Sequence, residues 1–202
     1  MAGPEATPAT SRVRARRGIA LGILVVCGSA ALTAQPLLDN VHSVAPGVVY
    51  RSGQLGTARL DTLIRRDRIR SILNLRGPRP GADWYDGEVA TSRRAGVEHV
   101  DFELSAVKDV SVPETERLVQ LMAALPKPLL VHCQAGADRS GLAAALYRYA
   151  ILQDTAAAAA SQLSIWYGHF PALNTGTAAM DRSYWAYVRS HPPRSPEGPP
   201  RF

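Results

Sequence analysis

The stretch from residue 129 to residue 141 constrains the fold more than any other part of the sequence. It begins with Leu129-Leu130-Val131-His132, continues through a loop of small residues, and leads into an Ala/Leu-rich helix expected over 141–152. A short strand that is apolar at successive positions is buried on both faces, which is typical of the centre of a parallel sheet. The sequence therefore predicts an α/β domain with a central, mostly parallel sheet flanked by helices.

The rest of the middle region repeats this alternation of strands and helices. Strands are expected at 48–51, 69–75 and 97–104, and helices from Thr57 onward, over 86–95, over 113–125 and over 155–166. Gly96 is expected to end the second of these helices, and Pro113 to begin the third. With 46% apolar residues the chain has enough material for one sizeable core, which we place at 39–188.

The positive charge of the chain is concentrated at its two ends. The net charge is +6, but residues 1–17 hold four arginines and one glutamate, and residues 189–202 hold three arginines and one glutamate. The middle region is nearly neutral, so we expect no nucleic-acid partner. Residues 1–17 are interpreted as a disordered basic N-terminus, and 189–202 as a Pro-rich disordered tail.

Residues 18–38 form an uncharged segment directly after the N-terminal arginines. Its strongly apolar part, 19–34, would make a helix of roughly 24 Å, between the length of a signal peptide core and that of a membrane anchor. We expect either a cleaved signal peptide or an anchor that attaches the chain to a membrane. The preceding arginines favour a cytoplasmic N-terminus, so the domain at 39–188 is expected on the extracytoplasmic, periplasmic side.

The loop after the apolar strand has the composition of an anion-binding site. It lies at the carboxyl edge of the predicted sheet, where open α/β folds bind ligands. Small residues let its backbone N–H groups converge, the helix beginning near Ser140 adds its positive end, and Arg139 offers a planar fork of donors. We expect a tetrahedral dianion to be bound by Gln134, Ala135, Gly136, Ala137, Asp138 and Arg139.

Cys133 stands at the start of this loop. Of the two cysteines, Cys27 lies in the apolar segment, so Cys133 is the single thiol of the predicted domain. Amide donors, a helix N-terminus and Arg139 all favour the thiolate, which is a strong nucleophile. Ser140 is positioned to hydrogen-bond the sulfur, and His132 is expected to shape the loop through backbone contacts. This chemistry requires neither a metal nor a cofactor.

The run His132-Cys133-Gln134-Ala135-Gly136-Ala137-Asp138-Arg139-Ser140-Gly141 resembles the signature of the cysteine-dependent protein tyrosine and dual-specificity phosphatases. Residues 50–55, 71–76 and 104–106 look like the compact bacterial dual-specificity-like group, which is similar to atypical plant and fungal phosphatases. The resemblance covers roughly 48–187. It implies a dual-specificity-phosphatase-like fold and hydrolysis of phosphomonoesters through a cysteinyl-phosphate. The implied partner is a phosphorylated protein or a small phosphate ester.

The resemblance also implies a general acid on a loop upstream of the signature. Asp109 fits by position, four residues before Pro113, and is favoured. Asp101 is the rival, 32 residues before Cys133 but within or at the end of a predicted strand. Glu103 and the absence of a dedicated acid remain open. Asp138 is interpreted as orienting Arg139, contacting substrate, or solvated.

The sequence says less about the substrate than about the reaction. We favour phosphotyrosine in proteins, with dual specificity included. The alternatives are an inositol polyphosphate or phosphoinositide cleaved by the same mechanism, and a non-catalytic phosphate-binding pseudophosphatase. Positions 134–138 hold no basic residue, which disfavours the inositol reading. Other candidates are a pocket mouth of Arg76, Arg79, Trp84 and Tyr85, a water-positioning Gln162, and a structural His169.

Overall fold

The computed structural model describes residues 39–173 and 175–192. The expectations for 1–17, for 18–38 and for most of the tail at 189–202 concern residues outside these ranges. Within the described ranges, no helix combines the length and the apolar character needed to cross a bilayer.

Five strands form one sheet in the order β1-β2-β5-β3-β4. They are β1 (His42–Ala45), β2 (Val49–Ser52), β5 (Leu129–His132), β3 (Ser71–Asn74) and β4 (Glu98–Asp101). Only the edge strand β1 is antiparallel to its neighbour, and the other three pairings are parallel. The prediction of a mostly parallel sheet with LLVH at its centre is confirmed.

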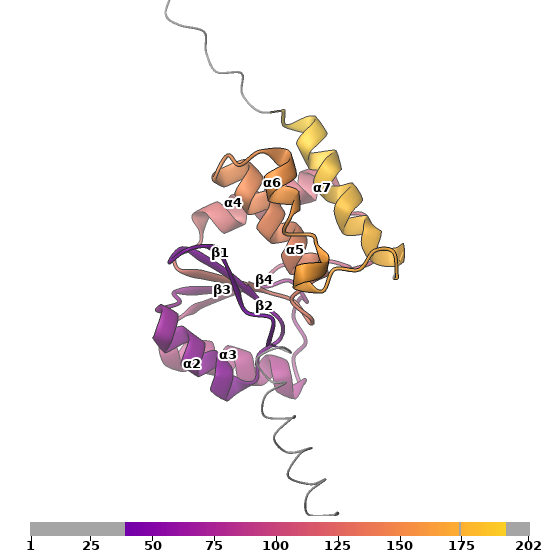
Figure 1. Ribbon diagram of the computed structural model, residues 1–202. Helices are drawn as coiled ribbons and strands as arrows, with labels where there is room; N and C mark the ends of the chain where they lie inside the picture. The colour runs from indigo at the N-terminus through magenta and orange to yellow at the C-terminus, as the bar shows by residue number, and fades with distance from the viewer. Residues whose placement is uncertain (1–38, 174, 193–202) are drawn as a thin grey trace, which may run out of the picture. The chain divides into compact units, whose positions relative to one another are not determined.

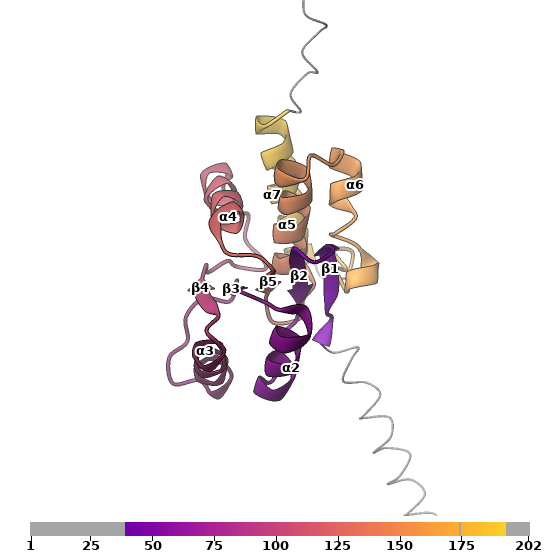
Figure 2. The same cartoon turned by 90° about the vertical axis from the view of Figure 1, so that its left-hand side faces the viewer.

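Helices cover both faces of the sheet (Figures 1 and 2). On one side lie α2 (Thr57–Asp67) and α3 (Asp83–Ala95). On the other side lie α4 (Val112–Ala124), α5 (Asp138–Leu146), α6 (Ala156–Ala160) and α7 (Ala178–Ser190). Shorter helical segments follow α5 at Tyr147–Ile151 and α6 at Ile165–Tyr167, and precede α7 at Thr175–Thr177.

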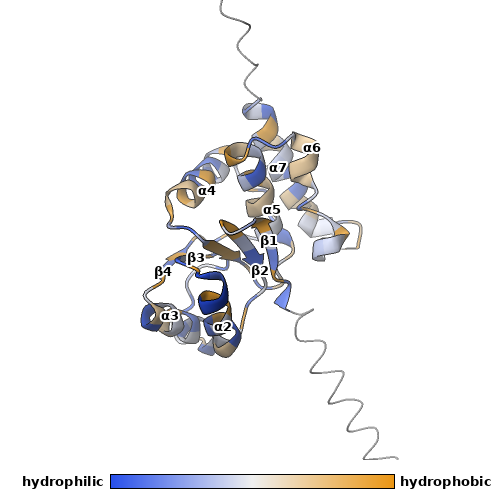
Figure 3. Cartoon of the chain, turned by 60° about the vertical axis from the view of Figure 1, so that its left-hand side comes forward, coloured by the Kyte–Doolittle hydropathy of each residue, from blue (hydrophilic) through white to orange (hydrophobic). Residues whose placement is uncertain are grey.

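The core is divided by the sheet because successive strand residues point to opposite faces. Leu73 and Val131 belong to the larger cluster, which includes residues of α4, α5 and α7. Ile72 and Leu130 belong to the smaller cluster, which includes Leu60 of α2. Figure 3 shows hydrophobic residues along the strands and hydrophilic residues over much of α2 and α3. This burial on both faces explains why β5 is apolar at successive positions.

The carboxyl ends of the four parallel strands are in register. Ser52 of β2 and Asn74 of β3 both pair with His132 of β5, and Asn74 also pairs with Asp101 of β4. The loops that follow these residues therefore meet at one edge of the sheet, and the loop that begins with Cys133 lies among them.

Several predicted boundaries were wrong. The helix after the cysteine loop begins at Asp138, three residues earlier than expected, and passes into a wider π-helical turn at Tyr147. The helix expected over 155–166 ends at Ala160, because the chain turns there and Gln162 O accepts a hydrogen bond from buried Arg51. Strands β3 and β4 are shorter than expected. β1 and α7 were not predicted, and α7 reaches Ser190, beyond the expected domain end at 188.

Candidate active site

The carbonyl groups of the signature loop, residues 133–139, are turned away from its centre. Gln134 O accepts a hydrogen bond from Gln54 N at 3.0 Å, and Ala135 O accepts one from Asn40 Nδ2 at 2.9 Å. The carbonyls of Gly136 and Ala137 both accept from Arg51 Nη2, each at 2.9 Å. The donors come from the segments 39–40 and 51–54, so residues far upstream in sequence hold the outside of the loop.

The N–H groups of the same loop face the other way. Within residues 39–173 and 175–192, no hydrogen bond uses the backbone N–H of any residue from 134 to 140. In a trans peptide the C=O and N–H point in opposite directions, so outward carbonyls turn the amides inward. The first turn of α5 adds the positive end of a helix dipole. This arrangement is a preformed site for a tetrahedral oxyanion.

Arg51 is the main support of this geometry. Its side chain is completely buried and also donates from Nη1 to Gln162 O at 2.8 Å and to Gln162 Oε1 at 3.1 Å. Its guanidinium carbon lies 4.4 Å from the ring centre of Tyr167. Burial lowers the pKa of Arg51 to about 10, although the nearby acidic groups Cys133, Tyr167 and Asp138 oppose this shift. The side chain therefore stays cationic at neutral pH.

Gly136 is required by the shape of the loop. Its φ is +70°, and a Cβ at this position would lie 2.5 Å from Gly53 N and 2.7 Å from Ser52 C. Only glycine adopts this conformation without cost and lets the loop approach the end of β2 so closely.

The thiol of the loop is buried and its guanidinium is partly buried. Cys133 is 2% exposed, and its Sγ lies 3.5 Å from Ser140 Oγ, which is the expected hydrogen bond to the sulfur. Arg139 Nη1 is held by Leu75 O and Leu104 O at 3.3 Å each. Arg139 Nε is buried and has no partner among the described residues, so it is a free donor for a ligand oxygen.

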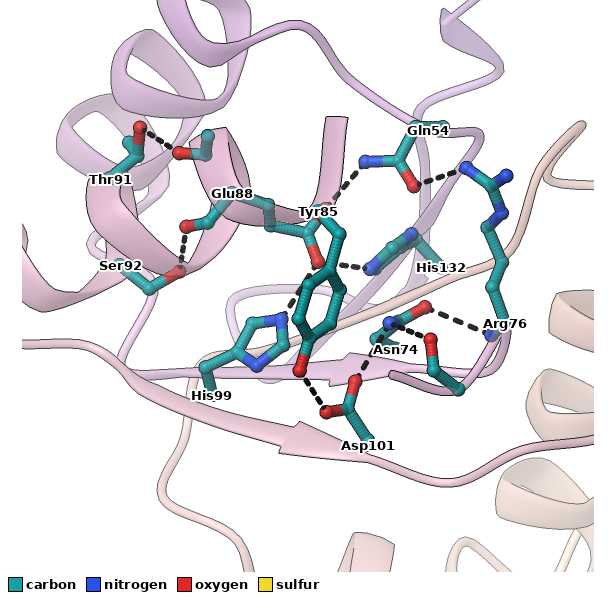
Figure 4. Close-up of polar contacts among 12 residues, drawn as sticks. Gln54, Asn74, Arg76, Tyr85, Glu88, Thr91, Ser92, His99, Asp101 and His132 are labelled. Carbon is teal, nitrogen blue, oxygen red and sulfur yellow. Dashed lines mark hydrogen bonds and ion pairs between the residues drawn. The ribbon is translucent and has the colours of Figure 1, made fainter. Parts of the chain in front are cut away.

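A buried carboxylate fixes the residue before the cysteine (Figure 4). Glu88 of α3 is 2% exposed, and its Oε1 accepts from His132 Nε2 at 2.9 Å and from His99 Nε2 at 2.8 Å. Its Oε2 accepts from Gln54 Nε2 at 2.6 Å. Burial opposes ionisation, but these hydrogen bonds outweigh it and lower the pKa of Glu88 to about 2. The ring of His132 is thereby clamped, and its Nδ1 lies 3.4 Å from Cys133 O, the predicted backbone contact.

The same network extends to the predicted pocket mouth. Gln54 Oε1 accepts from Arg76 Nη1 at 3.0 Å, and the Arg76 guanidinium lies 3.6 Å from the ring centre of Trp84. Burial is the first cause that lowers the pKa of Arg76, and the charge of Arg139 is the second. Arg79 instead pairs with Glu103 at 2.7 Å. Arg76 is thus a cation fixed close to the signature loop.

The family comparison agrees with this geometry. A model of the tyrosine phosphatase family matches residues 34–157, more than half of the chain. The chain belongs to the tyrosine phosphatase family. It is a cysteine-dependent phosphatase. Cys133 is the free cysteine of the described residues and lies in the signature loop. No curated protein matches the sequence.

Solved structures of phosphatases share the fold. P. aeruginosa TpbA is 20% identical, with a TM-score of 0.56 over 74% of this chain and 91% of that one. A cysteine-to-serine variant of TpbA in complex with pTyr is 19% identical, with the same TM-score and coverage. A putative phosphatase from Shewanella putrefaciens CN-32 is 20% identical, with a TM-score of 0.56 over 74% of this chain and 93% of that one.

The candidate acids of this phosphatase are all engaged. Asp109 lies on the exposed loop before α4 and forms a two-pronged ion pair with Arg182 of α7, at 2.7 Å from Nη2 and 3.0 Å from Nε. Asp101 accepts from Asn74 Nδ2 at 2.8 Å and from the Tyr85 hydroxyl at 2.6 Å. The hydrogen bond to Asp101 raises the pKa of Tyr85 to about 12. It also holds Tyr85, one of the residues predicted at the pocket mouth, against the end of β4. Both carboxylate oxygens of Asp101 are therefore engaged in hydrogen bonds that hold the fold, whereas Asp109 is the more exposed of the two.

Asp138 is paired with a histidine. His169 is 1% exposed, and its Nδ1 lies 2.7 Å from Asp138 Oδ1 while its Nε2 lies 2.9 Å from Asp181 Oδ2. Burial disfavours the imidazolium, but the two carboxylates outweigh it and raise the pKa of His169. The interpretation of His169 as structural is confirmed, and Asp138 is held by this ring.

Sequence reasoning missed the residues that support the loop from behind. Arg51 was quoted only as part of a motif, and Asn40 and Glu88 were assigned no role. A detectable signal existed for Arg51, because an arginine within a short strand beside an apolar central strand must be paired when it is buried. Gln162 was considered for positioning water, but its carbonyl and side chain both bind Arg51.

Proposed function

We propose that this phosphatase hydrolyses phosphomonoesters through a phosphorylated Cys133, with phosphotyrosine in proteins as its substrate class. The observation that carries the proposal is the signature loop, in which the carbonyls of residues 134–137 are held outward while the amides of residues 134–140 have no partner among the described residues. Gln134, Ala135, Gly136, Ala137 and Asp138 supply amides for the phosphoryl oxygens, and Arg139 supplies its guanidinium.

The reaction follows from these positions. Cys133 Sγ attacks phosphorus, the bond from phosphorus to the ester oxygen breaks, and the leaving oxygen takes a proton from the general acid. Water then attacks phosphorus and gives a proton to the carboxylate of the general acid, the S–P bond breaks with its electron pair returning to sulfur, and inorganic phosphate leaves. Ser140 Oγ, 3.5 Å from the sulfur, donates a hydrogen bond to the departing thiolate.

We assign the general acid to Asp109. Its carboxylate is more than half exposed and its ion pair with Arg182 lies at the surface, so the loop carrying it is weakly restrained. Apo geometry does not exclude a catalytic acid that becomes aligned only with substrate bound. Asp101 has both oxygens hydrogen-bonded to its own domain, which argues against a role in proton delivery.

Phosphotyrosine is supported by one relative. A TpbA variant was solved in complex with pTyr, and the present chain shares that fold. A substrate panel would test this choice with the full chain: phosphotyrosyl and phosphoseryl peptides beside inositol polyphosphates. We expect the highest kcat/KM for phosphotyrosyl peptides. A higher value for inositol polyphosphates would replace the substrate and leave the mechanism in place.

The mechanism is tested by comparing the same substitution at the two cysteines. Cys133→Ser should abolish hydrolysis of p-nitrophenyl phosphate and retain tungstate binding, because the amides and Arg139 remain. Cys27→Ser should keep wild-type turnover. Turnover by Cys133→Ser within about tenfold of wild type would contradict the assignment, since covalent catalysis by this residue would then be dispensable.

We also propose that residues 18–38 attach the chain to a membrane or export it, with the catalytic domain on the extracytoplasmic side. The support is the uncharged apolar segment behind a cluster of arginines. In a bacterial host, protease added to spheroplasts should digest the domain. Protection of the domain until the cells are lysed would place it in the cytoplasm instead.

A further inference from the structure

Four large apolar side chains are exposed together on the segment that follows α6. Trp166 and Leu173 are each 85% exposed, Ile165 is 62% exposed and Phe170 is 44% exposed. We call these four residues the apolar patch. The turn is fixed by its own backbone bonds, including His169 N to Ser164 O at 3.1 Å and Leu173 N to Phe170 O at 3.0 Å. Apolar side chains grouped in this way mark an interaction surface, whereas single exposed ones do not.

The chain segment that carries the patch has no charged side chain of its own. From residue 155 to residue 180 the sequence contains no Asp, Glu, Lys or Arg. The one histidine in this stretch, His169, is turned inward and is bonded to Asp138 and Asp181. A surface that meets water or a charged protein partner has no reason to exclude charge over such a length. A surface that enters the headgroup and acyl boundary of a bilayer does, because charges are costly there.

The patch also lies where the chain joins the domain. Asn40 Nδ2 donates to Tyr167 O at 2.9 Å, and the His42 ring packs edge-on against Tyr167 with centres 4.9 Å apart. Figure 2 shows the turn after α6 beside β1. Residue 38, the end of the predicted anchor, is covalently next to Asp39. An anchor that ends here leaves little chain between the bilayer and the patch.

We propose that the apolar patch docks into the interface of a lipid bilayer and holds the domain against the membrane. The proposal rests on the anchoring proposed above. Trp166 is the type of side chain that membrane interfaces favour, and the patch offers no cation, so zwitterionic lipid is sufficient. Because Tyr167 contacts Arg51 and His169 contacts Asp138, this docking brings the signature loop close to the membrane surface. The substrates are therefore phosphate esters presented at that surface.

Tryptophan quenching tests the docking with the full chain. The chain has three tryptophans, Trp84, Trp166 and Trp185, and residues 1–38 contain no aromatic residue, so an inserted anchor gives no signal. The protein is reconstituted into phosphatidylcholine vesicles with brominated acyl chains. We expect clear quenching in wild type and at least a threefold smaller quenched fraction in Trp166→Phe, since this side chain would be the deepest. Trp185→Phe, which removes a half-exposed tryptophan of α7, should keep the wild-type quenching.

A second variant and two further readouts make the outcome decisive. Leu173→Ser keeps all three tryptophans and should also reduce quenching, with unchanged hydrolysis of p-nitrophenyl phosphate as the check of folding. Quenching that persists in Trp166→Phe overturns the proposal. If the wild-type chain is not quenched and instead self-associates in sedimentation in a way that depends on Trp166, the patch is assigned to a second copy and the proposal is overturned. Release of the chain by carbonate contradicts the anchor and this docking, but leaves the proposed hydrolysis intact.

Discussion

The signature loop and the loop that carries Asp109 are held in opposite ways. The carbonyls of Gln134, Ala135, Gly136 and Ala137 each have a donor, and the guanidinium that serves two of them is completely buried. The acid loop, residues 105–111, is mostly exposed, and its aspartate is restrained by an ion pair in which both side chains are more than half exposed.

This difference separates two tasks of the enzyme. Oxyanion binding requires donors that are oriented before the reaction, because reorientation during the reaction would cost free energy. Proton donation to the leaving group requires a carboxyl that is aligned in the substrate complex, and this alignment need not exist beforehand. Val110 N donates to Ser183 Oγ at 2.8 Å, so the end of the acid loop is fixed on α7, while Asp109 itself is held by its exposed ion pair with Arg182. The structure thus combines a firmly held binding loop with a more exposed loop that carries the proposed acid, Asp109.

The largest effect is expected from removing the buried support. Arg51→Met keeps an aliphatic side chain but leaves the carbonyls of Gly136 and Ala137 without their donor. We expect kcat/KM for p-nitrophenyl phosphate to fall about 10³-fold as the amides lose their alignment. Tungstate affinity should fall with it. Arg65→Met, at a solvent-exposed arginine of α2, is the matched control and should keep wild-type kinetics. An Arg51→Met enzyme with unchanged tungstate affinity would show that the signature loop keeps its conformation without Arg51.

The close approach of the loop to β2 is tested by two glycines with the same backbone angle. Gly136 and Gly47 both have φ near +70°, but a Cβ at Gly136 meets Gly53 N at 2.5 Å and one at Gly47 meets nothing within 4 Å. Gly136→Ala should lower kcat/KM about 300-fold because the loop must shift. Gly47→Ala carries the same conformational strain and should reduce the melting temperature without lowering kcat/KM. Equal kinetic effects at the two positions would contradict the explanation that the close contact between Gly136 and β2 determines the loop geometry.

The sequence was sufficient for those parts of the fold and site that depend on local order. The apolar β5, the small residues after it and Arg139 are consecutive, so strand, loop and helix N-terminus could be placed together. Pro113 correctly marked the start of α4, where Ser111 and Glu114 also form a capping box.

The parts that were missed depend on contacts between distant residues. Arg51 binds carbonyls 85 and 86 residues away, and Asn40 binds one 95 residues away. The hydrophobic periodicity of a sequence carries no information about contacts between residues so far apart. Glu88 faces two histidines across the α3–sheet interface, yet its position in the helix carries no special pattern. The helix expected over 155–166 forms only along the alanine run and stops at Ala160 for the same reason, because Gln162 O accepts a hydrogen bond from distant Arg51.

The acid loop gives a smaller and substrate-dependent effect. Asp109→Asn should lower kcat for phosphotyrosine about 10²-fold, and should change kcat for an aryl phosphate with an acidic leaving group much less. Asp101→Asn is the control, and it should show no such dependence on the leaving group. If Asp101→Asn shows the dependence and Asp109→Asn does not, the acid has been assigned to the wrong residue.

The smallest effect concerns stability and its dependence on pH. The pKa of His169 is raised above about 6.5, its usual value, so the folded state binds this proton more tightly than the unfolded state. The resulting stabilisation is fully present below about pH 6.5 and is lost as pH rises through the raised pKa. The difference in melting temperature between wild type and His169→Gln should therefore narrow from about pH 6 to about pH 9. Arg182→Gln is the control, because it breaks the neighbouring ion pair with Asp109 and leaves the two contacts of His169 in place, so its difference from wild type should stay constant over the same range. A constant difference for His169→Gln as well would mean that the imidazolium contributes nothing to holding Asp138 against α7, and that the signature loop owes its rigidity to Arg51 and Asn40.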